Sequence, residues 1–410
     1  MQNLKILTRV AIASCLVLAG VALVGFDHLW EANRSYASPP PNKGAAPGAP
    51  PFPLEIAREG YFFAGGKYSS ANGPQMMSGQ IYAEFQIPAV QKHRYPVVMI
   101  HGGNQTGTNF TGTPDGREGW AQFFLRQGYA VYVMDQAGRG RSAYQAGLYG
   151  PSAPPDLLST QKRFTAIERY NLWPQAHLHT QWPGAGVPGD PVFDQFFASQ
   201  VPAIVDYGVQ QELSNTAIIA LLEKIGPSIL LTHSQSGPLG WLAADARPSL
   251  VKAVVAVEPN GPPFFNVDNV GAPEWFRDAP DKQRPWGITG VPLQYSPAAG
   301  NAADLEIARQ DKPDGRDLSR CWLQKDPPRQ LPNLEKMPIL ILTSESSYHA
   351  AYDHCTVKYL EQAGVHPKWV RLADAGIHGN GHMMMLEKNS EAIAALMSRW
   401  LDAALPAPSR

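Results

Sequence analysis

Apolar segments of two kinds alternate along most of the chain. Short continuous runs, such as YPVVMI at 95–100 and VKAVVAV at 251–257, have the pattern of strands that are covered on both faces. Between such runs lie amphipathic stretches, such as TAIIALLEKI at 216–225, which a Gly-Pro pair ends and which predict helices. Strands that alternate with helices predict an α/β fold, with a mostly parallel central sheet and helices on both of its faces.

The same two patterns recur along the rest of the folded part. Further strands, of which the first two pair antiparallel, are expected at 61–68, 80–87, 129–135, 228–232, 338–343 and 368–373. Further helices are expected at 116–128, 237–246, 352–363 and 391–405.

Two segments interrupt this alternation. Residues 143–212 and 259–335 lack clean periodicity and are rich in Pro, Gly and aromatic residues. Irregular segments of this length are uncommon unless they have a function. We therefore expect a cap built from these insertions at the carboxyl ends of the strands, where open α/β sheets bind ligands. Residues 54–410 then form one domain with a cap.

The N-terminal segment predicts export. Lys5 and Arg9 precede an uncharged apolar run at 10–26, which is typical of a secretory signal. The run is also long enough to remain as a membrane anchor, and it contains a weak lipoprotein box. A buried helix of a cytosolic protein is the alternative. Residues 1–37 are therefore assigned to a signal peptide or anchor and 38–53 to a Pro-rich tether, so we expect a periplasmic or secreted protein.

Composition and charge narrow the function further. The 34 basic and 35 acidic residues leave a net charge of −1, whereas nucleic-acid binding needs a basic excess. The charge balance therefore argues against a nucleic-acid-binding protein.

His177 and His179 have a spacing that suits a metal, but no third ligand pattern is visible, so packing within the cap is favoured. Cys321 and Cys355 are expected to pair in an oxidising compartment, with two buried free thiols as the alternative.

The segment SILLTHSQSGPLG, at 228–240, has the clearest chemical content. An apolar strand runs into Ser234 and a helix follows, which is the strand–turn–helix setting of a nucleophilic serine. The positions two before and two after it hold Thr232 and Ser236 instead of glycine, so the strict G-x-S-x-G pattern is not met. The alternative is a strand-end serine that makes a turn hydrogen bond.

Two other strand ends predict loops near this serine. The strand at 95–100 ends in His-Gly-Gly, and the backbone amides of Gly103 and Gln235 are expected to bind a developing oxyanion. The glycine-rich motif at 135–142 also follows a strand and predicts a tight loop, in which Asp135 is structural.

Position along the chain does not decide which histidine is the general base or which carboxylate is the acid that orients it. His378 and His382 both lie on the glycine-rich loop before the last helix, and either one can act as a general base. For the acid that orients the imidazole, sheet order slightly favours Glu345 over Glu258, with Asp353 as a weaker third.

Five motifs together resemble those of secreted bacterial serine esterases of the α/β-hydrolase superfamily, over roughly residues 56–405. They are HGGNQTGTNFTGTPDGREGW, DQAGRGRS, THSQSGPLGW, VEPNGPPF and GIHGNGHMMMLEK. The resemblance implies the α/β-hydrolase fold and a Ser–acid–His triad without cofactor or metal. It assigns the acid to Glu258, in the VEP motif, and the base to His382, before the Met run. Glu345 and His378 remain the alternatives.

The expected function is therefore cleavage of carboxylic esters, in small molecules or polymers, through an acyl-enzyme on Ser234. A lactonase, an amidase or a polymer-ester hydrolase with the same triad is an alternative. A non-catalytic binding protein on a hydrolase scaffold is the alternative from another class.

Overall fold

The computed structural model describes residues 53–71 and 73–406. The expected signal peptide or anchor, 1–37, lies outside the described residues, as does nearly all of the expected tether at 38–53. None of the helices in the described ranges has the length and apolar character needed to cross a membrane.

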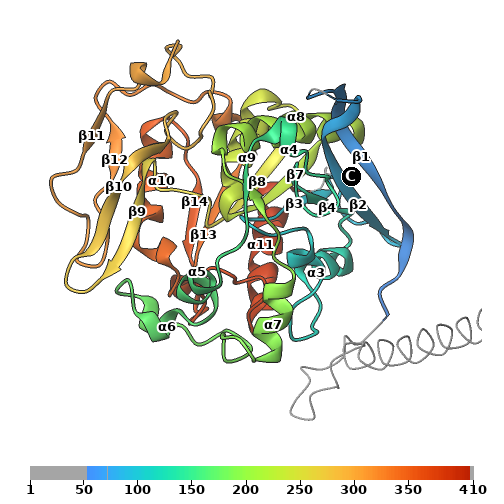
Figure 1. Cartoon of the computed structure of the whole chain (residues 1–410), viewed down its shortest axis with the longest axis horizontal. Coiled ribbons are helices and arrows are strands. Elements are labelled where there is room, and N and C mark those ends of the chain that lie inside the picture. Colours follow the sequence, from blue (N-terminus) through green and yellow to red (C-terminus); the bar gives the residue numbers. More distant parts are fainter. Residues whose placement is uncertain (1–52, 72, 407–410) are drawn as a thin grey trace, which may run out of the picture. The chain divides into compact units, whose positions relative to one another are not determined.

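An eight-stranded sheet forms the centre of the domain, in the order β1-β2-β4-β3-β7-β8-β13-β14 (Figure 1). Strand β2 is antiparallel to both of its neighbours, and from β4 onward all neighbours are parallel. The strands are β1 (Ile56–Ser69), β2 (Met76–Pro88), β3 (Val97–Ile100), β4 (Val131–Asp135), β7 (Ser228–His233), β8 (Val251–Val257), β13 (Ile339–Thr343) and β14 (Lys368–Arg371). The predicted mostly parallel sheet, with an antiparallel opening pair, is confirmed.

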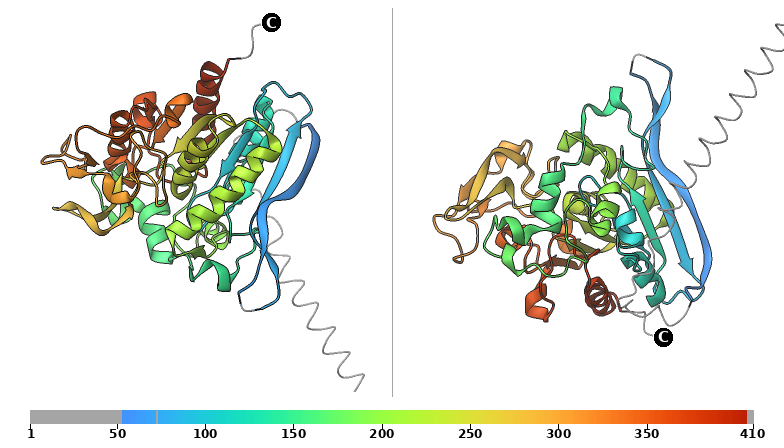
Figure 2. Two further views of the ribbon diagram at one scale, coloured as in Figure 1. Left: turned by 90° about the horizontal axis from the view of Figure 1, so that it is seen from above. Right: turned by 60° about the horizontal axis from the view of Figure 1, so that its bottom comes forward.

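Helices cover both faces of this sheet (Figure 1 and Figure 2). In β3, Val98 and Ile100 belong to a core cluster with α8 (Tyr207–Ile225), α9 (Gly237–Ala246) and α10 (Asp353–Gln362). Val97 and Met99 belong to a second cluster, with α3 (Trp120–Gln127) and α11 (Ser390–Ala404). Because successive side chains of a strand point to opposite faces, a doubly covered strand must be apolar throughout.

The two irregular segments contain short elements. The first holds α4 (Ala146–Tyr149), α5 (Leu157–Thr160), α6 (Ile167–Tyr170), α7 (Pro191–Ala198) and the short strands β5 (Ser152–Ala153) and β6 (Ala203–Ile204). The second holds two hairpins, β9 (Phe264–Gly271) with β10 (Trp275–Arg284), and β11 (Ile307–Arg309) with β12 (Trp322–Gln324). A further short helix, α2 (Thr108–Thr111), follows β3.

Helix α8 begins earlier than the sequence pattern predicts, at Tyr207, inside the segment expected to extend to 212. The Asp206 side chain accepts a hydrogen bond from the Val209 amide at 3.0 Å and so caps the helix. The first turns of α8 have no apolar periodicity, because Gln210 and Gln211 are buried there as polar side chains.

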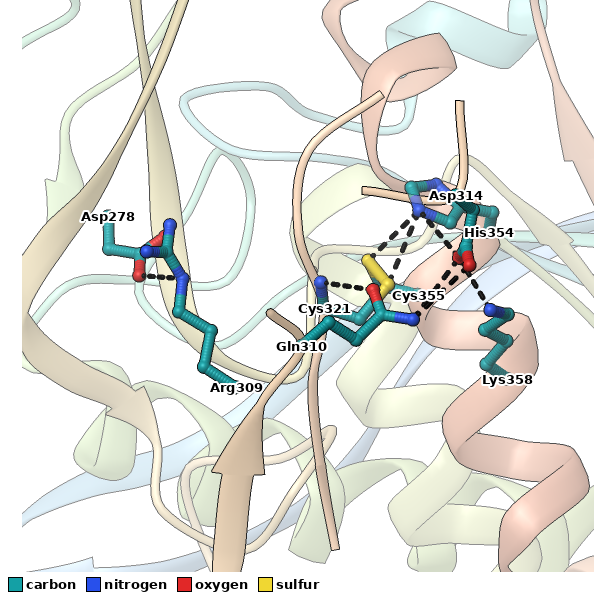
Figure 3. Close-up of a disulfide and its surroundings, with 8 residues drawn as sticks. All are labelled: Asp278, Arg309, Gln310, Asp314, Cys321, His354, Cys355 and Lys358. Carbon is teal, nitrogen blue, oxygen red and sulfur yellow. Dashed lines mark hydrogen bonds and ion pairs between the residues drawn. A yellow bond between two sulfur atoms is a disulfide. The ribbon is translucent and has the colours of Figure 1, made fainter. Parts of the chain in front are cut away.

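The predicted disulfide between Cys321 and Cys355 is present and joins the second irregular segment to the first turn of α10 (Figure 3). Gln310 accepts a hydrogen bond from the Cys321 amide at 2.8 Å, and His354 Nε2 lies 3.3 Å from Cys321 Sγ. Both cysteines are fully buried, so the bridge is part of the interior.

Candidate active site

Ser234 lies at the turn between β7 and α9, at the carboxyl end of the parallel strands. Its φ of 55° is in the left-handed region, which is strained for a residue with a side chain. The Asn260 amide donates to the Ser234 carbonyl oxygen at 2.8 Å and helps to hold the turn. His233, Gln235 and Ser236 are buried, whereas Ser234 is half-buried, so the turn presents this hydroxyl.

The two departures from the glycine pattern have structural explanations. A Cβ at Gly240 of α9 would lie 3.0 Å from Thr232 Cγ2, so the missing side chain on the helix makes room for the threonine on the strand. Ser236 Oγ accepts from the His233 amide at 2.8 Å and lies 2.7 Å from the Ile100 carbonyl oxygen. The small polar side chain therefore ties the turn to the end of β3.

His382 and Glu258 form a buried hydrogen-bonded pair. His382 Nδ1 lies 2.6 Å from Glu258 Oε2, and both side chains are almost completely inaccessible. Burial lowers the pKa of His382 well below its usual range, and His233, His349 and Arg163 act in the same direction. The imidazole is therefore neutral near neutral pH, which is the form that accepts a proton.

Glu258 is held by serines that follow β13. Ser344 donates to Oε1 from its amide at 2.7 Å and its hydroxyl lies 2.6 Å from the same oxygen, while Ser347 Oγ donates to Oε2 at 2.7 Å. Burial raises the pKa of Glu258 to about 7, whereas His349 and the hydrogen bonds from Ser344 act to lower it. Sequence reasoning missed both serines; their signal is the SESS cluster that directly follows a central strand.

The alternative acid and base contact each other at a separate place. His378 Nδ1 lies 3.0 Å from Glu345 Oε1, and the His378 side chain is 62% exposed. The third candidate acid, Asp353, lies 2.7 Å from His349 Nδ1. The structure thus brings only Glu258, of the three candidate acids, into contact with His382.

Arg139 connects the two segments expected to form the oxyanion hole. Its Nη1 donates to the Gly102 carbonyl oxygen at 2.9 Å and its Nη2 to Gln235 Oε1 at 2.5 Å. A Cβ at Gly103 would lie 3.8 Å from Gln235 Cβ, so the two residues are adjacent. Burial lowers the pKa of Arg139 to about 10, which leaves it charged at neutral pH. Sequence reasoning missed Arg139, although the motif 135–142 was expected near the site.

Four rings surround the imidazole of His382. The rings of Phe164 and His349 stack on it with centroid distances of 5.3 and 4.9 Å, and those of His233 and Tyr348 lie 4.5 and 4.8 Å away. Burial raises the pKa of Tyr348 to about 12, while Arg163 and a hydrogen bond with Ser234 act to lower it. Phe164 belongs to the first irregular segment, which therefore reaches the catalytic candidates. Tyr348 and His349, in contrast, follow β13 and were missed from the sequence.

The remaining candidates have other roles. His179 Nε2 lies 2.8 Å from Glu387, while His177 contacts the Pro174 carbonyl oxygen, so the pair shares no ligand position. The three methionines after His382 are fully buried in the core. Asp135 accepts from the Gly107 and Arg141 amides, as a structural residue does.

One group of potential metal ligands lies in the site itself. Glu258, His349 and His382 offer ligand atoms that lie within 4.8 Å of one another. Nδ1 of each imidazole already faces a carboxylate, Glu258 for His382 and Asp353 for His349. This donor set fits a hydrogen-bonded network better than a metal site, which needs its ligand atoms directed at one point.

Comparisons with known proteins show the family of this chain. A family model described as alpha/beta hydrolase family matches residues 97–396. The probable secreted lipase phiG of a fungal species is 45% identical over 343 residues, which cover 83% of this chain and 89% of that protein. A solved structure described as a novel bacterial esterase is 25% identical, with a TM-score of 0.57, and the match covers 88% of this chain and 99% of that one.

Proposed function

Because the chain belongs to the alpha/beta hydrolase family and is a hydrolase of the esterase or lipase type, we propose that it is an exported serine esterase. In this proposal Ser234 is the nucleophile, His382 the general base and Glu258 the acid. The observation that carries it is the buried contact of 2.6 Å between Glu258 and His382, beside a serine held at a strained turn.

The proposed reaction has two steps. His382 Nε2, which has no hydrogen-bond partner within the described chain, takes the proton of the Ser234 hydroxyl as its oxygen attacks the ester carbonyl carbon. The same imidazole then returns the proton to the departing alcohol, which leaves an acyl-enzyme. Water, deprotonated in turn by His382, attacks the acyl-enzyme and releases the acid. Glu258 accepts from Nδ1 throughout and stabilises the imidazolium.

The proposed oxyanion hole consists of the Gly103 and Gln235 amides. A backbone donor in such a hole contributes about 10²–10³ in rate, because it is oriented before charge develops. Arg139 supports this arrangement, since it binds both segments and places a buried positive charge behind them.

Export is supported by two independent observations. The 45% identical relative is described as secreted, and a buried disulfide links two cysteines of the mature domain, which is typical of oxidising compartments. Whether residues 10–26 are removed or remain as an anchor is testable by N-terminal sequencing of the exported protein.

The first test compares the purified full-length protein with its Ser234→Ala variant on a short para-nitrophenyl ester. We expect a loss of at least about 10³-fold in kcat, because the variant has no nucleophile. Ser249→Ala, which changes an exposed serine between α9 and β8, is the matched control and should keep normal turnover. Equal turnover by Ser234→Ala and the wild type would refute the proposed nucleophile.

Covalent labelling separates an enzyme from a binding protein on the same scaffold. A fluorophosphonate should label the wild type at Ser234 and leave Ser234→Ala unlabelled. A wild-type protein that stays unlabelled would favour the non-catalytic alternative.

A further inference from the structure

Three arginines lie around the site without a carboxylate partner. Within the described chain, Arg139, Arg163 and Arg284 form no ion pair, although eight other arginines do, as Arg141 does with Asp135 at 2.8 Å. A cation at a desolvated position is costly unless an anion compensates it. Arg139 and Arg284, which are buried, therefore need an explanation that the triad alone does not provide.

Arg163 is the member of this group that a substrate can reach. Its side chain is exposed, and its Cζ lies 4.3 Å from the centroid of the Tyr348 ring. Tyr348 is buried, its ring is 4.8 Å from that of His382, and it is hydrogen-bonded to Ser234. Only one buried ring therefore separates the accessible guanidinium from the nucleophile and the base.

Arg284 adds a second cation from another part of the chain. It is 2% exposed, its Nε donates to the Pro262 carbonyl oxygen at 2.7 Å, and its Nη2 has no hydrogen-bond partner within the described chain. Burial lowers the pKa of Arg284 to about 10, so it is charged at neutral pH. Pro262 belongs to the segment that directly follows Glu258, so Arg284 contacts the part of the chain that carries the acid, and both Arg163 and Arg284 act to lower the pKa of His349.

The carboxylates close to these cations do not balance them. Glu258 accepts from His382 and from two serines, so it is occupied by the triad. Asp353 faces His349, and burial raises the pKa of Asp353 well above its usual range, which disfavours its charged form. The side of the site formed by Arg163 and Arg284 thus has an excess of positive charge, and Arg284 Nη2 is a donor without a partner in the described chain.

We infer that the preferred substrate is an ester that carries a carboxylate, which binds Arg163, with Arg284 as the second cation. A guanidinium presents parallel donors that match a carboxylate, and such charge-assisted hydrogen bonds are about twice as strong as neutral ones. This inference rests on the proposed ester hydrolysis and adds a substrate class to it. The competing explanation is that Arg163 only pins its segment to the domain by stacking on Tyr348.

The test uses pairs of esters that differ only in the charged group. Para-nitrophenyl adipate monoester has a carboxylate where para-nitrophenyl hexanoate has a methyl group. Carboxyphenyl hexanoate and phenyl hexanoate form the second pair, with the charge on the leaving group. We expect the full-length protein to favour the charged ester of at least one pair by about 10- to 100-fold in kcat/KM, the usual range for a charged hydrogen-bonded contact.

The arginine variants assign this preference to a residue. Arg163→Met should reduce the ratio of the two kcat/KM values to about one, mainly through KM, and Arg163→Lys should retain part of it. Arg94→Met is the matched control, because Arg94 is also exposed and stacked on a tyrosine, at 5.3 Å from the Tyr95 ring, but precedes the amino end of β3. The ratio should not change in this control.

The outcomes separate the two proposals. Hydrolysis of the neutral esters without a preference in either pair, or a preference that survives in Arg163→Met, would overturn the anionic substrate and leave the esterase intact. If no ester is hydrolysed, the esterase fails, and the anion site is then decided by direct binding of adipate. Isothermal titration calorimetry should show adipate binding to the wild type and not to Arg163→Met; equal binding to both proteins, or binding to neither, would overturn the anion site.

Discussion

At the scale of single residues, two side chains of the proposed triad are attached to strained backbone. Glu258 has a φ of 43° and Ser234 a φ of 55°, both in a region that costs about 1–3 kcal/mol for residues other than glycine. Tertiary hydrogen bonds hold both positions, since the Glu258 amide donates to the Leu342 carbonyl oxygen at 2.9 Å and the Asn260 amide to that of Ser234. Both strained positions lie at strand ends, and from one of them Glu258 contacts His382.

Glutamine substitutions at Glu258 and Glu345 test which of the two glutamates is the acid of the triad. Glu258→Gln keeps the shape of the side chain but cannot stabilise the imidazolium, so kcat should fall by about 10³–10⁴-fold. Glu345→Gln is the matched change at the acid that contacts the exposed His378, and it should cost less than about tenfold. Steady-state kinetics with one ester measures kcat for both variants. A larger loss of kcat in Glu345→Gln than in Glu258→Gln would reverse the assignment.

At the scale of elements, a buried histidine joins the first irregular segment to the loop that carries His382. His179 Nδ1 lies 3.0 Å from Glu168, at α6, and its Nε2 lies 2.8 Å from Glu387. Glu387 in turn accepts from the Gly381 amide at 2.9 Å and from Asn380 Nδ2 at 2.7 Å. The position of the His382 loop therefore depends on a segment that is remote in sequence.

This contact makes stability depend on pH. Burial acts to lower the pKa of His179, but its contacts with Glu168 and Glu387 raise it from 6.5 to about 9. Because the pKa is raised on folding, the contribution of charged His179 to the free energy of unfolding is fully present below about pH 6.5. It is lost as the pH rises through about 9. His179→Gln should destabilise the protein by about 3 kcal/mol at low pH, because it leaves a buried carboxylate unpaired.

Urea unfolding at several pH values measures this effect. The difference between the wild type and His179→Gln should shrink between about pH 7 and pH 10. His177→Gln is the control, because His177 is exposed and contacts only the Pro174 carbonyl oxygen, and it should leave stability almost unchanged. A constant difference between the wild type and His179→Gln would show that His179 is not charged in the folded protein.

At the scale of the whole molecule, the disulfide closes a loop from the last part of the second irregular segment to helix α10. Cys321 and Cys355 are 34 positions apart, so the bridge restricts a long stretch of the unfolded chain that includes β12 and β13. Loop-closure entropy assigns about 3–4 kcal/mol to a bridge of this span.

Reduction should therefore lower the free energy of unfolding by about that amount. Urea unfolding with and without a thiol reductant measures it, and the double variant Cys321→Ala/Cys355→Ala should be destabilised and insensitive to the reductant. Thiol titration of the denatured, unreduced wild-type domain should find neither of these two cysteines free. Two titratable thiols from Cys321 and Cys355 would contradict the bridge.

The sequence by itself determined the eight strands of the central sheet, most helices and the position of Ser234, but not the strands inside the two irregular segments. These features have local causes, since a doubly covered strand is continuously apolar and a strand–turn–helix around a serine is readable within one segment. Expectation and structure differ at α8, whose first turns bury polar side chains and so lack an apolar pattern.

Only the tertiary structure decided which acid faces which base. Sheet order slightly favoured Glu345, and the family resemblance pointed to Glu258; the contact of Glu258 with His382 joins residues 124 positions apart, which no local pattern encodes. The positions of Arg139, Arg163 and Arg284 depend on the packing of three distant segments in the same way. Local periodicity therefore specifies the sheet, whereas the chemistry of the site arises where the ends of separate strands and the irregular segments meet.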